Sequence, residues 1–152
     1  RWLCAAVPVE RVAWAERITD LYVEGTRLRL REARRLDGGV VMRRLAKKAD
    51  LDIGRRLITS LYLDEAEFAL FAGLPGRRLV KVRHHLAVAK GVSFSVDRFE
   101  GPLAGLVLAE AEFDDDAAMA AFPHPDFSVR EVTDDPRYNG GTLAWTGWPA
   151  QP

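Results

Sequence analysis

Apolar and charged residues alternate along several short segments of this 152-residue chain. A period of two places successive side chains on opposite faces of an extended strand. RLRLR (27–31) and LVKVRHH (79–85) alternate in this way, and Arg44, Ala46 and Lys48 would share one face in RRLAKK (43–48). A fourth, GLVLAEAEF (105–113), is an apolar run that ends in two glutamates one residue apart. The pattern therefore predicts a sheet with one apolar face and one charged face.

Turn residues divide the chain into about eight strands and two helices. The strongest turn signal is Asp37, Gly38 and Gly39, which predicts a hairpin. Residues 9–17 are expected to form a connecting turn of helix, and residues 90–91 a turn between strands. Strands are expected at 1–7, 18–24, 28–33, 40–48, 57–63, 78–88, 92–100 and 105–113, with strand character again at 129–133.

The two expected helices have recognisable ends. Asp64, with Glu67 three residues on, is a capping-box signature for a helix that Pro75 stops. The acidic residues 114–116 precede a shorter helix that Pro123 ends. Because antiparallel hairpins follow one another, a meander that closes into a barrel is favoured. The expected fold is mainly β with a few helices (α+β), in a single domain over residues 1–152.

Composition narrows the class of protein. The hydrophobic fraction of 48% and the charged fraction of 29% are typical of a soluble globular domain. Basic and acidic residues both number 22, so no overall positive field favours nucleic acid. No membrane span or secretory signal is present, and the single cysteine, Cys4, excludes an internal disulfide. We expect a cytoplasmic protein without nucleic-acid or membrane partners, in which Trp145 and Trp148 are candidates for a homodimer contact.

The charged face has two interpretations. In an ordinary barrel it would meet water, and its arginines would serve solubility. In the alternative it would line a lumen, while helices and partner surfaces cover the outside. Such a lumen would bind a polyanion and a divalent cation together, because Arg matches phosphate oxygens and carboxylates bind hard cations. Phosphoryl transfer needs little beyond positioning and charge stabilisation, so triphosphate hydrolysis is a natural reaction class.

Several acidic and aromatic residues are candidates for that chemistry. Glu110 and Glu112 share one strand face, either as a solvated surface or as a site for Mg²⁺ or Mn²⁺. Tyr22 is a candidate to orient water, although a tyrosine in a strand is more often a packing residue. Asp97 is either an acidic lumen residue or a surface residue.

The ordered motifs of the chain also resemble a known family. They are RLRLR, LAKK, LITSLYL, LPG, LVKVRH, VDRFEG, GLVLAEAEF, REVTDD and YNGGTLA. Each is weak alone, but their order and spacing resemble the CYTH domain of the triphosphate tunnel metalloenzymes over nearly the whole chain. The resemblance implies a closed eight-stranded antiparallel β tunnel with a charged lumen. It also implies hydrolysis of inorganic, thiamine or nucleoside triphosphates with Mg²⁺ or Mn²⁺, and some members are adenylate cyclases.

The resemblance also implies roles for individual residues. The family's first strand reads Glu, any, Glu, any, Lys. Arg1 occupies the lysine position, so both glutamates would precede this chain and its first strand would be truncated. Metal would be bound by Glu110 and Glu112, with Asp97 as a further candidate. Phosphates would be bound by Arg1, Arg29, Arg31, Lys48, Lys81 and Arg83, and by Arg27 if it shares their face.

We therefore expect a metal-dependent hydrolase of short triphosphates. No aromatic platform is evident that would select a base, which favours inorganic tripolyphosphate as the substrate. The alternatives are a thiamine or nucleoside triphosphatase, an adenylate cyclase-like enzyme, and a module that binds polyphosphate or a nucleotide without cleaving it.

Overall fold

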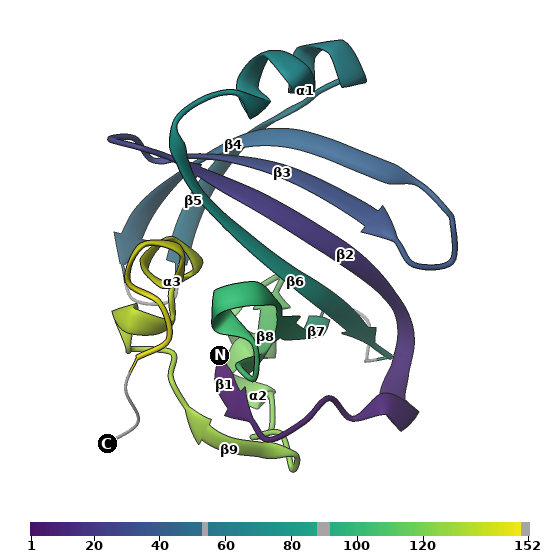
Figure 1. Cartoon of the computed structure of the whole chain (residues 1–152). Helices are drawn as coiled ribbons and strands as arrows, with labels where there is room; N and C mark the ends of the chain where they lie inside the picture. The colour runs from purple at the N-terminus through teal and green to yellow at the C-terminus, as the bar shows by residue number, and fades with distance from the viewer. Residues whose placement is uncertain (53–54, 88–91, 150–152) are drawn as a thin grey trace.

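The computed structural model describes residues 1–52, 55–87 and 92–149, with the backbone alone at 48–52 and 55–56. The turn expected at residues 90–91 therefore lies outside the described residues. One antiparallel sheet of nine strands dominates the described fold, in the order β5-β4-β3-β2-β6-β7-β8-β1-β9 (Figure 1). The strands are β1 (Trp2–Cys4), β2 (Val12–Val23), β3 (Leu28–Arg35), β4 (Val41–Asp52), β5 (Arg55–Tyr62), β6 (Gly76–Leu86), β7 (Val92–Phe99), β8 (Val107–Phe113) and β9 (Ser128–Glu131).

Three α-helices and three short 3₁₀ turns complete the described part of the chain. They are η1 (Val9–Arg11), α1 (Glu65–Ala72), η2 (Gly101–Leu103), α2 (Asp116–Ala121), η3 (Pro136–Tyr138) and α3 (Gly140–Thr146). The capping box of α1 is confirmed, since the Asp64 side chain accepts from the Glu67 amide and the Glu67 side chain from the Asp64 amide. None of the described helices is long and apolar enough to span a membrane.

The mainly β, antiparallel fold is confirmed, but three details differ from expectation. Residues 9–17 form only the short turn η1 and then begin β2, because β2 pairs with β6 from Val12 to Val23. A third helix, α3, follows the loop after β9. The sheet has nine strands instead of eight, and no hydrogen-bonded pairing joins its edges β5 and β9 within the described residues. Closure into a barrel is therefore not confirmed.

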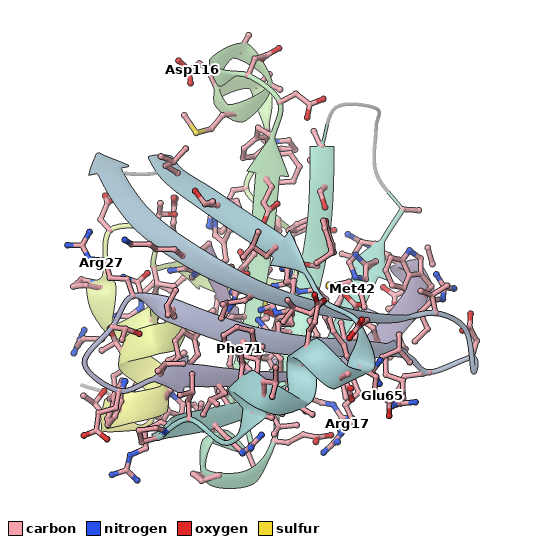
Figure 2. The ribbon with its side chains drawn as sticks, turned by 90° about the horizontal axis from the view of Figure 1, so that it is seen from above. Arg17, Arg27, Met42, Glu65, Phe71 and Asp116 are labelled. Atoms are coloured by element: carbon pink, nitrogen blue, oxygen red, sulfur yellow. The ribbon has the colours of Figure 1, made fainter. Side chains whose placement is uncertain are left out.

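The apolar face of the sheet packs against helices and loops. Leu21, Leu30 and Leu45 contact Phe68 and Phe71 of α1. Figure 1 shows α1 on the outer side of β3 and β4, and Figure 2 shows Phe71 on the helix above the sheet. A second apolar cluster lies on the same face further along the sheet, made by Trp2, Cys4, Leu86, Phe94, Val96, Val107 and Ala109 with Phe122 and Phe127.

The opposite face, which we call the charged face, carries buried ionic side chains. The sheet curves around this face, so that residues distant in sequence meet there. At one end the face becomes apolar, where Leu79, Phe99 and Leu108 pack against Leu143 of α3. Tyr22 packs against the same cluster. The α3 helix therefore covers one end of the charged face.

The close approach of α3 to the sheet depends on Gly140. A β-carbon on Gly140 would overlap the Tyr22 hydroxyl oxygen, whereas one on Gly141 would lie 3.6 Å from Tyr22 Cε1, an ordinary contact. We expect Gly140→Ala to lower the free energy of unfolding by about 1–3 kcal/mol through overpacking. Urea denaturation measures this, with Gly141→Ala as the matched control.

A double variant makes the prediction specific. Tyr22→Phe removes the overlapping oxygen, and Tyr22 Cζ would then lie 3.3 Å from the new β-carbon. The effects of Gly140→Ala and Tyr22→Phe should therefore be non-additive, with the double variant more stable than the sum of the single effects predicts. Equal destabilisation by the two alanine variants would contradict this account of Gly140.

Candidate functional site

The pairing register of the sheet brings the charged residues together. Arg31 lies opposite Asp20 on β2 and opposite Arg44 on β4. Arg83 of β6 lies opposite Asp97 of β7, and Ser95 of β7 lies opposite Glu110 of β8. Residues that are directly opposite share a face, so the register alone places these side chains on the charged face.

Asp20 is the centre of the first ionic cluster, on β2 and β3. Its side chain is 1% exposed and accepts two hydrogen bonds of 2.7 Å from Nε and Nη2 of Arg31. Arg29 Nε lies 3.6 Å from the same carboxylate. Burial alone would raise the pKa of Asp20, but Arg31 and Arg29 outweigh it and hold that pKa well below its usual range. The carboxylate is therefore ionised and compensates part of the arginine charge.

Asp97 and Glu110 form the second cluster, on β6, β7 and β8. Arg83 donates to both Asp97 oxygens at 2.7 and 2.8 Å, and Lys81 also bonds Asp97. Arg83 Nη2 donates to Glu110 Oε2 at 2.7 Å, while Arg1 Nε donates to Glu110 Oε1 at 2.9 Å. Burial opposes ionisation of Glu110, but Lys81, Arg83 and Arg1 together bring its pKa well below the usual range.

Two arginine groups on the charged face have no hydrogen-bond partner in the described part of the chain. They are the buried Nε atoms of Arg29 and Arg44. Burial, together with Arg31 and Arg29 nearby, lowers the pKa of Arg44. Arg31 and Arg29 lie within ion-pair distance of Asp20, whereas no ion pair from Arg44 to a carboxylate is found among the described residues. This side of the face therefore carries excess positive charge. Buried polar groups are normally paired, so these donors indicate a site for an anion.

The structure places the other expected site residues in different ways. Arg27 is exposed in the bend before β3, and Figure 2 shows it at the periphery, so it does not join the cluster. Lys48 lies in β4 opposite Ile58, with a side chain outside the described residues. Tyr22 packs beneath α3, and burial raises its pKa to about 12. Both oxygens of Asp97 are bonded by Lys81 and Arg83.

The sequence interpretation did not select Asp20, Arg44 or Asn139 as site residues. Asn139 accepts from Arg1 Nη1 at 2.8 Å and so helps to position that guanidinium. A usable signal existed for Asp20, because it is the one charged residue in ITDLYV (18–23) and lies two residues before Tyr22, therefore on the same face. No comparable local signal identifies Asn139, which reaches Arg1 only through the packing of α3.

The acidic residues fit a metal ion only in part. Within the described residues, no group of three His, Cys, Asp or Glu side chains is placed to hold one. Glu112 is exposed beside Glu110, whose two oxygens each accept from an arginine. Magnesium often takes one or two carboxylates and completes its shell with phosphate oxygens and water. Glu110 and Glu112 fit such a shared site and do not form an all-protein one.

A cavity of about 540 Å³ lies elsewhere, on the apolar face. Its walls include Phe94, Phe122 and Phe127, and its charged residues Arg11 and Asp126 bond each other at 2.7 Å. It offers no group of free donors for an anion, so the charged face remains the candidate site.

Comparison with known proteins relates this geometry to a class of enzymes. No protein-family model matches the sequence. The chain is 40% identical over 86 residues to the inorganic triphosphatase of Nitrosomonas europaea, a match that covers 55% of this chain and 56% of that protein. It is 46% identical over 54 residues to the inorganic triphosphatase of Acetivibrio thermocellus, covering 36% and 33%. The chain thus spans about half the length, or less, of the curated relatives it matches.

Solved structures match over a longer part of the chain. The crystal structure of the inorganic triphosphatase NE1496 has a TM-score of 0.61 at 27% identity and covers 94% of this chain and 93% of that one. The PH1819 protein from Pyrococcus horikoshii shares the fold, with a TM-score of 0.57 at 21% identity over 78% of this chain and 80% of that one. These similarities confirm the resemblance to the CYTH family of triphosphate tunnel metalloenzymes.

Asp20 should be essential for stability, since it neutralises buried arginines. We expect Asp20→Asn to lower the free energy of unfolding by about 3–5 kcal/mol, because it leaves buried charge uncompensated. The pKa of Asp20 is depressed in the folded protein. Its ionised carboxylate therefore contributes its full stabilisation above the unfolded pKa of about 4, and this stabilisation is lost progressively as the pH falls from there toward the folded pKa. The stability of the wild type should therefore fall more steeply in acid than that of the variant.

Urea denaturation from pH 7 down to pH 3 measures both effects. Asp37→Asn is the control, because Asp37 pairs with Arg35 at the surface and its loss should change stability little. The account of Asp20 is wrong if the two variants unfold at the same urea concentration.

Proposed function

We propose that the chain is a metal-dependent hydrolase of short triphosphates, with inorganic tripolyphosphate as the preferred substrate. The observation that carries this proposal is that the buried Nε groups of Arg29 and Arg44 have no hydrogen-bond partner in the described part of the chain, although Arg29 Nε lies 3.6 Å from Asp20. They lie on a face with excess positive charge, where a phosphate chain would complete their hydrogen bonding. The similarity to two inorganic triphosphatases, and to the crystal structure of an inorganic triphosphatase, supports the same substrate.

In this proposal the basic residues of the charged face hold the phosphates. Arg29, Arg31 and Arg44 bind one part of the chain from β3 and β4, and Lys81 and Arg83 bind it from β6. Water adds to the terminal phosphorus, the bridging P–O bond breaks, and orthophosphate and pyrophosphate leave. The positive side chains stabilise the charge that develops on the phosphate oxygens. The curved sheet would then act as a tunnel with a charged lumen.

Glu110 and Glu112 would hold the cation from β8. When bound, Mg²⁺ or Mn²⁺ neutralises the phosphate chain and polarises water. The two carboxylates lie on the same strand, one residue apart on one face, and phosphate oxygens would provide further ligands. Asp97 would act as the fixed counter-ion of Lys81 and Arg83, since both of its oxygens already accept from them.

The surroundings of Trp14 support the inorganic substrate over a nucleotide. The Trp14 ring stacks on His85 with 3.6 Å between centroids, and the Arg35 guanidinium lies 4.4 Å from the ring on the other neighbouring strand. Strand β2, which carries Trp14, lies between β3 and β6, which carry these partners. Both faces of the indole are therefore occupied, and it offers no platform for stacking a base.

A phosphate-release assay tests the proposed reaction. We expect release from tripolyphosphate with Mg²⁺ or Mn²⁺, none with chelator, and much lower release from ATP and thiamine triphosphate. Tight binding of tripolyphosphate without release, measured by calorimetry, would favour the alternative of a non-catalytic polyphosphate-binding module. Faster release from ATP than from tripolyphosphate would reject the inorganic substrate.

Arg44 provides the sharpest test of the phosphate site. Arg44→Gln removes a donor that has no hydrogen-bond partner at Nε in the described part of the chain, so the substitution should affect activity without lowering stability. We expect kcat/KM for tripolyphosphate to fall about 100-fold, the size of a lost buried charged contact. Stability should stay equal or rise, because repulsion from Arg29 and Arg31 is relieved.

Arg34→Gln is the matched control, since Arg34 is exposed on the neighbouring strand and bonds only Glu32 among the described residues. It should leave kcat/KM within about twofold of the wild type, in line with the small effects of surface substitutions. An Arg44→Gln enzyme with wild-type kcat/KM would remove Arg44 from the phosphate site.

A further inference from the structure

Glu110 differs from Asp20 and Asp97, the two fully buried carboxylates of the charged face, in how it is held. Asp20 and Asp97 are each 1% exposed and each accepts a two-pronged contact from one arginine. The Glu110 side chain is 26% exposed, and its two oxygens accept single hydrogen bonds from different arginines. Glu110 is thus the most accessible and least firmly held of the three.

The arginines that hold Glu110 are also groups that would bind phosphate. Arg83 Nη2 donates to Glu110 at 2.7 Å and to Asp97 at 2.8 Å, so this one nitrogen serves two carboxylates. Arg1 Nε, at 2.9 Å, is the other donor. A carboxylate oxygen and a phosphate oxygen accept the same kind of charge-assisted hydrogen bond, so both would compete for these donors.

We propose that Glu110 is an internal competitor of the substrate, displaced from Arg1 and Arg83 when a phosphate chain binds. The displaced carboxylate becomes available to the cation that accompanies the phosphates. This inference rests on the proposed function, because it assigns a binding order to the same site. No covalent step is involved, since only hydrogen bonds and ion pairs exchange.

The charges around Glu110 explain why the phosphate chain would bind before the cation. Arg1, Arg83 and Lys81 all lie close enough to Glu110 to affect its ionisation. They repel a divalent cation from the carboxylate until a polyanion neutralises them. The phosphate chain therefore increases the affinity of Glu110 for the cation, and by thermodynamic linkage the cation increases the affinity for phosphate by the same factor.

The experiment is calorimetric binding of tripolyphosphate in chelator, where no cation contributes. Glu110→Gln removes the competing charge, so we expect metal-free affinity to rise about tenfold, equivalent to about 1.4 kcal/mol. Glu112→Gln is the matched control. It removes the same charge two residues along on the same face, but no ion pair from Glu112 to an arginine is found within the described residues. It should change the metal-free affinity by less than about threefold.

A second readout follows the exchange directly. The NMR signal of the Arg1 Nε–H group should shift when tripolyphosphate is added to the wild type in chelator. In Glu110→Gln that signal should already be displaced before any phosphate is added. The signal should be at its wild-type position in Glu112→Gln.

The outcomes separate this inference from the proposed function. If the wild type binds tripolyphosphate but Glu110→Gln binds it equally or more weakly, the competitor role is overturned while the phosphate site stands. An equal gain in both glutamine variants also overturns it, because general loss of negative charge then explains the result. If the wild type binds no tripolyphosphate with or without Mn²⁺, the proposed function itself fails.

Discussion

The pairing of buried arginines with buried carboxylates is the interaction on which the rest of this structure depends. Removing a guanidinium from water costs several kcal/mol, and like charges on adjacent strands add repulsion. Asp20 between Arg31 and Arg29, and Asp97 between Arg83 and Lys81, offset that cost. The sheet can therefore curve around a charged face while its basic side chains stay both buried and protonated.

That constraint reverses the usual organisation of a β protein. Because much of the enclosed face is ionic, a large part of the hydrophobic stabilisation comes from the opposite face, where α1 covers Leu21 and Leu30 and the aromatic cluster covers Val107 and Ala109. Among the described residues, the charged face also carries an apolar cluster near α3, which includes Leu79 and Phe99. Most of the charged face is therefore not needed for apolar packing, and under the proposed function its ionic residues are available to a phosphate chain.

Local patterns predicted much of the framework, and long-range pairing decided the rest. The alternation that puts Arg29 and Arg31 on one face, and the Asp64 cap, are properties of neighbouring residues and could be read directly. Residues 12–17 became strand because β6 pairs with them, which no local signal showed. Arg27 continues the alternation of Arg29 and Arg31, but it lies in the bend that precedes β3 and therefore outside the strand. Which arginine Nε groups lack a hydrogen-bond partner among the described residues depends on the position of Asp20 in the assembled sheet, which no local pattern shows.

The packing of α3 over one end of the charged face affects how a long phosphate polymer would bind. Leu143 and Tyr138 pack beside Leu79 and Leu108 in one buried cluster, so under the proposed function a phosphate chain would not enter from that end. A long polyphosphate would then bind by its terminus and be shortened stepwise. Gel analysis of chain lengths during digestion distinguishes this mode from interior cuts, which would produce mid-length fragments early.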